Sequence, residues 1–126
     1  MGNDKKTILV VEDNPLAAKA NAMILEMLGC QVELTDDGDK AVQMIKENHY
    51  DGICMDIGLI TLSGTEACLA IREHEVKNHL RQVPIVAVTG NNSEEEAKTD
   101  MEVGMQAVIE KPLTKKKAEY FLSFCN

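Results

Sequence analysis

Short apolar runs and segments with helical periodicity alternate five times along this chain of 126 residues. Residues 8–11 are apolar without a break, which is typical of a central strand that is covered on both faces. Residues 31–35 alternate instead, as a half-buried strand at a sheet edge would. Further buried strands are predicted at 53–56, 84–89 and 107–109. This order of elements predicts a parallel α/β sheet of the (βα)5 type.

Capping and turn residues indicate where the helices between these strands begin and end. Asn14 is a favoured N-cap, and Pro15 suits the first helical position. Gly29 should end the first helix and Gly104 the fourth. The remaining helices are predicted to begin at Asp37-Gly38, near Ser63, at the capping box Ser93-x-x-Glu96 and at Lys115-Lys116-Lys117.

The spacing of apolar residues predicts which face of each helix is buried. In the first helix the apolar positions are Leu16, Ala20, Met23, Ile24, Met27 and Leu28. The same spacing places four methionines in the core, namely Met23, Met27, Met44 and Met101. The inner face of the last helix should carry Ala118, Phe121 and Leu122.

Length and composition limit the classes of protein that remain. The chain fits a single domain, residues 1–126, with its core from about residue 6 to residue 125. Its net charge of −8 argues against nucleic-acid binding, because phosphate backbones require a basic surface. No apolar run approaches the roughly 20 residues of a membrane span, so we expect a soluble protein without direct membrane contact. Four scattered cysteines without C-x-x-C spacing indicate buried, reduced thiols and a cytoplasmic location.

Polar side chains with matching chemistry follow the predicted strands. Glu12 and Asp13 come after the first strand, Asp56 ends the third, Thr89 ends the fourth and Lys111 follows the fifth. In a flavodoxin-like sheet of order 2-1-3-4-5, the first and third strands are neighbours, so the carboxylates should converge. Ligands bind at this edge of such a sheet, where the strand order reverses. The sequence therefore predicts one site that contains three carboxylates, a hydroxyl and an ammonium group.

Three neighbouring carboxylates repel one another, and a hard cation with oxygen ligands relieves that repulsion. Magnesium suits a shallow site of this kind, with manganese as an alternative. A carboxylate can attack phosphorus when cations neutralise the phosphoryl oxygens. Taken singly, Asp13 reads best as a turn residue and Lys111 as a solvated charge. Their joint position at strand ends favours a site.

With these residues the sequence resembles the receiver domain of two-component response regulators, from Lys6 to the end of the chain. Four segments carry the resemblance: Ile8-Leu9-Val10-Val11-Glu12-Asp13-Asn14, Met55-Asp56 with Gly64 eight residues later, Val86-Ala87-Val88-Thr89-Gly90 and Glu110-Lys111-Pro112-Leu113. Any one segment would be weak, but the joint set is specific. The resemblance implies that the domain catalyses its own phosphorylation and dephosphorylation in a phosphorelay.

The resemblance also implies a role for each acidic residue. Asp56 would accept a phosphoryl group from a phosphohistidine, on a histidine kinase or a histidine phosphotransfer domain. Glu12 and Asp13 would bind the metal together with Asp56, and the backbone carbonyl of Gly58 would be a further ligand.

Further positions would pair with the phosphoryl group or control access to it. Lys111 would pair with the acyl phosphate and form a cis bond to Pro112, which costs little before proline. Thr89 would reorient toward the phosphoryl group. Gly90 beside it leaves room for close approach, and Asn91 together with Gly58 would border the path of water.

Two positions depart from the family pattern. Ile60 stands where the family usually has proline, four residues after Asp56. Val108 stands three residues before the lysine, where many members have a Tyr or Phe that acts as a rotamer switch. The signal would then reach the fourth helix and fifth strand through Thr89 and backbone shifts instead of a moving ring, or the output would be weak.

Two alternatives remain for the context of this domain, and two other functions are disfavoured. The segment Asp56-Ile57-Gly58-Leu59 is most similar to receivers of hybrid sensor histidine kinases, so the chain would be the cytosolic part of a larger, membrane-anchored kinase. A stand-alone response regulator is the main alternative. An aspartyl-phosphate hydrolase is disfavoured, because Gly58 replaces the second acid that such enzymes carry and no cap insertion is present. A module that is never phosphorylated is disfavoured by the complete acidic site.

The histidines and the lysine run remain outside the predicted site. His49, His74 and His79 lie in polar segments away from strand ends and read as surface residues. The run 115–117 reads as solvated charge, with docking of a partner as the alternative.

Overall fold

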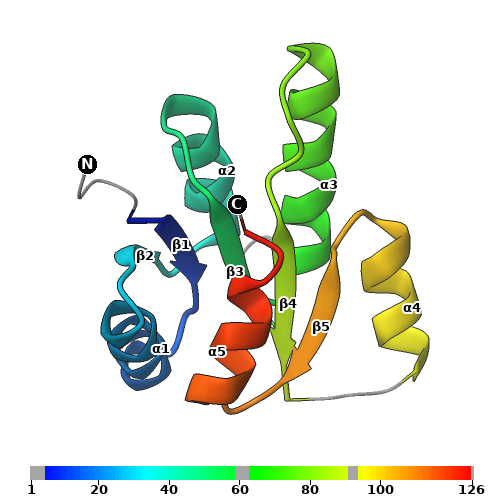
Figure 1. Ribbon diagram of the computed structural model, residues 1–126. Helices are drawn as coiled ribbons and strands as arrows, with labels where there is room; N and C mark the ends of the chain where they lie inside the picture. Colours follow the sequence, from blue (N-terminus) through cyan, green and yellow to red (C-terminus); the bar gives the residue numbers. More distant parts are fainter. Residues whose placement is uncertain (1–4, 59–62, 91–93, 126) are drawn as a thin grey trace.

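The computed structural model describes residues 5–58, 63–90 and 94–125, and in these ranges five parallel strands form one sheet. The strand order is β2-β1-β3-β4-β5, as predicted (Figure 1). The strands are β1 (Thr7–Val11), β2 (Gln31–Thr35), β3 (Gly52–Asp56), β4 (Ile85–Thr89) and β5 (Ala107–Glu110). β1, β3 and β4 are buried nearly throughout, whereas β2 is mostly exposed, which confirms its position at the edge.

Helices cover both faces of the sheet and enclose two apolar clusters (Figure 1). The helices are α1 (Pro15–Met27), α2 (Gly38–Glu47), α3 (Gly64–Lys77), α4 (Glu94–Glu102) and α5 (Lys115–Leu122). Leu25 of α1 and Phe121 of α5 pack into one cluster, while Ala41 of α2 and Ile71 of α3 pack into the other. α4 lies beside β5.

The predicted helix ends are largely confirmed. The Asn14 side chain caps α1 by accepting hydrogen bonds from the N–H groups of Leu16 and Ala17. Gly29 and Gly104 have φ angles of +91° and +108°, which favour glycine after a helix end. Ser63 and Glu66 form a capping box at α3. Ser93, the first residue of the predicted box, lies outside the described residues.

The predicted buried face of α1 is confirmed at Ile24 and Leu28 and wrong at its other four positions. Leu16, Met23 and Met27 are 81%, 54% and 80% exposed, and Ala20 is exposed as well. The core side of α1 consists instead of Ala18, Asn21, Ala22 and Leu25, with Ile24 and Leu28 partly buried. Small alanines let the helix backbone lie close to the sheet, so the larger apolar residues on the opposite side remain outside.

Two other methionines divide between surface and core. Met101 of α4 is 49% exposed, which corrects its assignment to the core. Met44 of α2 is partly buried against the core, as predicted. Hydrophobicity alone could not separate these cases, because the burial of each methionine depends on how its helix packs, and α4 packs mainly on the edge strand β5.

The four cysteines are free and buried, as predicted. Burial raises the pKa of Cys68 to about 11 and that of Cys125 to about 12. Such thiols remain protonated and unreactive at neutral pH. In the described part of the chain, no helix has the length and apolar character that crossing a membrane requires.

Candidate functional site

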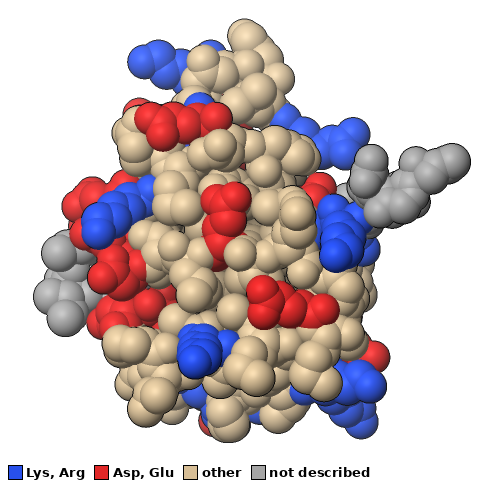
Figure 2. Space-filling model, turned by 90° about the vertical axis from the view of Figure 1, so that its left-hand side faces the viewer, with Lys and Arg blue, Asp and Glu red and all other residues tan. Residues whose placement is uncertain are grey.

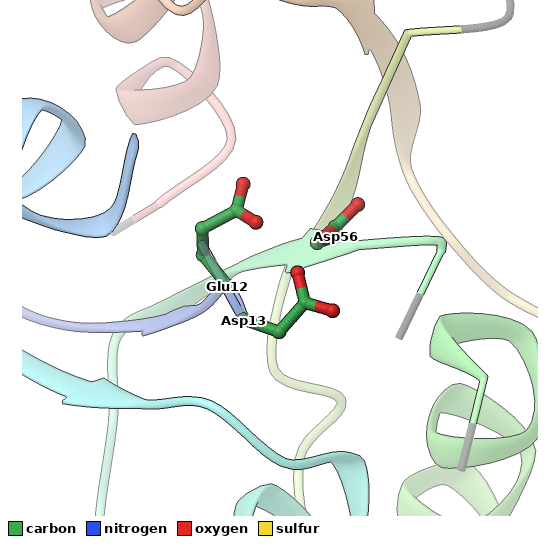
Figure 3. A group of neighbouring side chains, drawn as sticks. All are labelled: Glu12, Asp13 and Asp56. Carbon is green, nitrogen blue, oxygen red and sulfur yellow. The ribbon is translucent and has the colours of Figure 1, made fainter. Parts of the chain in front are cut away.

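The register between β1 and β3 brings the three predicted carboxylates together. Val11 pairs with Met55, so Glu12, which follows β1, lies beside Asp56, which ends β3. Asp13 comes one residue later, before the cap of α1. One carboxylate oxygen from each of the three residues lies within 4.8 Å of the others (Figure 3).

Glu12 is the most buried of these carboxylates, with 3% of its surface exposed. Its Oε2 accepts a hydrogen bond from the backbone N–H of Asn14 at 3.2 Å. Burial and the neighbouring Asp56 raise the pKa of the Glu12 carboxyl, although Asn14 and Lys111 oppose the shift. The fold therefore holds negative charge at a position where the charge is costly.

Lys111 supplies the cation of the site. Its Nζ lies 3.2 Å from Glu12 Oε1 and 3.3 Å from Asp56 Oδ1. Burial lowers the pKa of Lys111, but the two carboxylates raise it more, so the ammonium remains charged. The side chain is 35% exposed, so the ammonium is partly open to solvent.

The backbone around Lys111 is fixed from two directions. Its N–H donates to the carbonyl of Thr89 at 2.8 Å, which extends the pairing of β4 with β5. The bond to Pro112 is cis, as the resemblance implied. Lys117 Nζ donates to the carbonyls of Glu110 and Pro112, at 2.9 and 3.3 Å, on either side of Lys111. The sequence indicated solvated charge at residues 115–117 and did not predict the contacts of Lys117, which depend on the turn that precedes α5.

The end of β4 borders the site. Thr89 is 7% exposed and pairs in register with Glu110 of β5. Gly90 is exposed, and a Cβ added there would meet no atom within 4 Å. Open space therefore lies beside Gly90, and the access path expected there stays a prediction. Asn91, which was predicted to border that path, lies outside the described residues.

Two glycines hold the loop and helix that follow Asp56. The N–H of Gly58 donates to Asp56 Oδ1 at 3.2 Å, which orients the carboxylate. A Cβ on Gly64 would lie 2.6 Å from the backbone oxygen of Asp56, so only glycine lets α3 start this close. Gly64 belongs to the sequence motif that carries the resemblance, but the sequence did not predict that Gly64 packs on the backbone of Asp56. Ile60 lies outside the described residues.

Val108 is packed and does not face the carboxylates. It pairs with Ala87 in the middle of the β4–β5 ladder and lies half-buried against the cluster that α2 and α3 cover. Valine has no aromatic ring, so no ring at this position can move between the surface and the interior.

The histidines remain apart from the site. His49 and His74 line a cavity of about 240 Å³ at the opposite edge of the sheet, formed by the segments that lead into β3 and β4. The His49 side chain is 86% exposed, His79 is exposed and His74 is half-buried. Among the described residues, the group of potential metal ligands contains only Glu12, Asp13 and Asp56.

This donor set fits a divalent cation. Three carboxylates and one ammonium make up the site, so negative charge exceeds positive charge, and burial together with the neighbouring Asp56 raises the pKa of Glu12. All the side-chain donors are hard carboxylate oxygens, which magnesium and manganese accept and softer metals avoid.

Comparison with known proteins agrees with this geometry. The family model of the response regulator receiver domain matches residues 8–120. Transcription factor SKN7 of Candida albicans is 33% identical over 113 residues, which is 90% of this chain and 19% of that protein. The chain spans 12–19% of the length of the curated relatives it matches.

Two solved structures are informative. The receiver domain of sensor histidine kinase PA1611 from Pseudomonas aeruginosa, with magnesium in its active-site cleft, is 31% identical with a TM-score of 0.84. The match covers 95% of this chain and 97% of that one. The receiver domain of Saccharomyces cerevisiae Ssk1, in complex with the histidine phosphotransfer protein Ypd1, is 28% identical with a TM-score of 0.87. That match covers 96% of this chain and 89% of the other.

Proposed function

Because this chain belongs to the response regulator receiver domain family, whose model spans residues 8–120, we propose that Asp56 is its phosphoryl acceptor in a two-component phosphorelay. One observation carries this assignment. Asp56 lies in the carboxylate group and contacts Lys111 at 3.3 Å, and its place in the family motif distinguishes it from Glu12, which contacts Lys111 at 3.2 Å. A nucleophile for phosphorus needs both an adjacent metal site and a cation, and Asp56 has both.

Magnesium would be held by Glu12, Asp13, Asp56 and the backbone carbonyl of Gly58, and manganese could replace it. The bound ion supplies charge neutralisation at the phosphoryl oxygens. The magnesium in the cleft of the PA1611 receiver supports this choice of metal.

The transfer itself exchanges one bond for another. A carboxylate oxygen of Asp56 attacks phosphorus, and the O–P bond forms while the N–P bond of the donor phosphohistidine breaks. The leaving imidazole nitrogen keeps the electron pair. Lys111 moves with the phosphoryl group and offsets its charge, while the Thr89 hydroxyl donates to a phosphoryl oxygen.

The donor is a protein, and it must cover the residues beside Asp56 in order to bring its imidazole to the carboxylate. α1 begins at Pro15, two residues after Asp13, and its outward face carries Leu16, Met23 and Met27. Figure 2 shows the side of the molecule with α1, β2 and α2, where broad areas lack charged side chains. We infer that this α1 surface, Leu16 with Met23 and Met27, contacts a histidine phosphotransfer domain or kinase. The Ypd1 complex of the Ssk1 receiver supports such a partner.

The context of the domain is a separate proposal. A hybrid sensor histidine kinase is supported by the PA1611 receiver, and the domain would then lie in the cytoplasm as the cytosolic part of that kinase. A stand-alone regulator, or a regulator with an output domain as in the relative SKN7, is the alternative.

Phosphotransfer from a protein donor tests the proposal. A histidine phosphotransfer protein carrying labelled phosphate is mixed with the chain in the presence of magnesium. Label should move to the wild-type protein but not to Asp56→Asn. Transfer to that variant at the wild-type rate would show that another residue accepts the phosphoryl group.

A further inference from the structure

α3 and α4 are joined by polar contacts along one side of α3. Near its start, Thr65 Oγ1 donates to Asp100 Oδ1 of α4 at 3.3 Å. One turn later, the Cys68 thiol lies 3.5 Å from the carbonyl of Val103, just beyond α4. Cys68 and Asp100 are buried, at 0% and 2% exposure, whereas Thr65 and Val103 are half-buried.

Arg72 makes the strongest contact of this series. Its Nε and Nη2 both donate to the carbonyl of Gly104, at 3.1 and 2.8 Å, and Nη2 also reaches Gln106 Oε1 at 3.2 Å. The residue is 8% exposed. A Cβ on Gly104 would lie 3.0–3.4 Å from Arg72 atoms, so the guanidinium lies directly against the backbone where α4 ends.

The partners of Arg72 connect it to β4 as well. Glu75 Oε1 accepts from Arg72 at 2.7 Å, and Oε2 accepts from the N–H of Val83 at 2.7 Å. Gln106 Oε1 also accepts from the N–H of Ile85 at 2.7 Å. Because a guanidinium has a rigid fork, movement of α3 should change all of these contacts together.

The other end of α3 is fixed to the phosphoacceptor strand. The N–H of Gly64 donates to the carbonyl of Ile57 at 3.3 Å, and Gly64 packs directly on the backbone oxygen of Asp56. α3 thus begins at the acidic site and runs beside α4 to the α4–β5 connection (Figure 1). A shift of the Asp56 backbone or of the loop beside it would reach α3 at its first turn.

We propose that the α3–α4 seam, formed by Thr65, Cys68 and Arg72 with their partners, transmits the state of Asp56 to α4 and to the α4–β5 connection. The proposal rests on Asp56 being the phosphoacceptor. The proposal gives these polar contacts the signalling role that residue 108 cannot take, because Val108 is half-buried against the core and has no ring. The three seam residues are positioning residues, because none of them touches the phosphoryl group.

A nuclear magnetic resonance titration with beryllofluoride and magnesium tests the seam. In the wild type, amide signals of Ile57 and Gly58 and those of residues 98–105 should both shift. The double variant Thr65→Val with Arg72→Lys keeps similar volume and the charge beside Glu75, but loses the hydroxyl and the fork. Signals near Asp56 should respond as before, while the response at 98–105 should fall about twofold or more.

The matched control is Leu69→Ala, on the exposed side of the same helix, where Leu69 is 51% exposed. Its response at 98–105 should equal that of the wild type. A thermal melt of each variant checks the fold, and Thr65→Val alone serves if the double variant does not fold.

Each outcome decides one question. An unchanged response at 98–105 in the seam variants, or a wild-type response limited to the neighbours of Asp56, overturns the seam. No response near Asp56 in the wild type overturns the assignment of the phosphoacceptor instead, and the seam proposal fails with it.

Discussion

Glu12 shows that the site is organised for a cation at the expense of stability. Its carboxylate is almost fully buried beside Asp56, and burial and that neighbour raise its pKa. A carboxyl whose folded pKa lies above its unfolded value binds protons more tightly in the folded state, so stability falls as the pH rises through that interval. At neutral pH the charge on Glu12 therefore destabilises the metal-free protein.

Replacing Glu12 with Gln should consequently raise the free energy of unfolding at pH 7 without metal. The amide can still accept from Asn14, and it can donate to Asp56. Magnesium at about 100 times its dissociation constant should stabilise the wild type by about 2.7 kcal/mol and stabilise Glu12→Gln much less. Urea unfolding with and without magnesium measures both effects. We would reject this account if Glu12→Gln were less stable than the wild type without metal, or if magnesium stabilised both proteins equally.

Gly64 allows a second prediction on the scale of a residue. A methyl group there would overlap the backbone oxygen of Asp56, so Gly64→Ala should cost about 1–3 kcal/mol, as overpacking usually does. Gly90→Ala is the matched control, because it points into open space and should change stability by less than about 0.5 kcal/mol. Denaturant unfolding compares them, and equal stabilities would show that α3 does not need this close approach.

At the scale of elements, α1 shows what hydrophobic spacing can and cannot predict. The limits of the helix followed from Asn14, Pro15 and Gly29, whose backbone preferences are local. The buried face did not follow, because alanines are equally compatible with a close approach to the sheet and with solvent. Exposed Met23 and Met27 became informative only after the core side was known.

The α1 surface leads to a prediction about donor choice. Leu16→Asp with Met23→Asp should slow phosphotransfer from a histidine phosphotransfer protein by about tenfold or more, since tenfold corresponds to about 1.4 kcal/mol of contact energy. Autophosphorylation by acetyl phosphate should be unchanged, because a small donor does not cover α1. Val76→Asp, at a position of α3 that is 73% exposed, is the matched control. Equal loss with both donors would mean that the substitutions damage the site itself.

The sequence also could not reveal contacts that depend on tertiary placement. Lys117 reaches two carbonyls beside Lys111, and Arg72 reaches Gly104 from another helix, 32 residues away in sequence. In the sequence both resemble ordinary surface charges. Glu12, Asp56 and Lys111 were predictable because parallel strands end at one edge, so their order alone places them together.

On the scale of the whole molecule, the acidic site and the histidine cavity lie at opposite ends of the strands. The carboxyl edge of the sheet carries Glu12, Asp13, Asp56 and Lys111, while the opposite edge carries the His49 and His74 cavity. The strand order β2-β1-β3-β4-β5 was predictable from five alternating elements and right-handed crossovers. The site therefore depends on the sheet as a unit and on no single loop.

The measurement that tests the central assignment most directly is the intact mass of the protein after incubation with acetyl phosphate. The wild type should gain one phosphoryl group with magnesium and none when the metal is chelated. Asp56→Asn should gain none, whereas Asp36→Asn, at a side chain that is 69% exposed, should behave as the wild type does. An unmodified wild type, or a phosphoryl group retained on Asp56→Asn, would contradict the assignment of Asp56 as the phosphoacceptor.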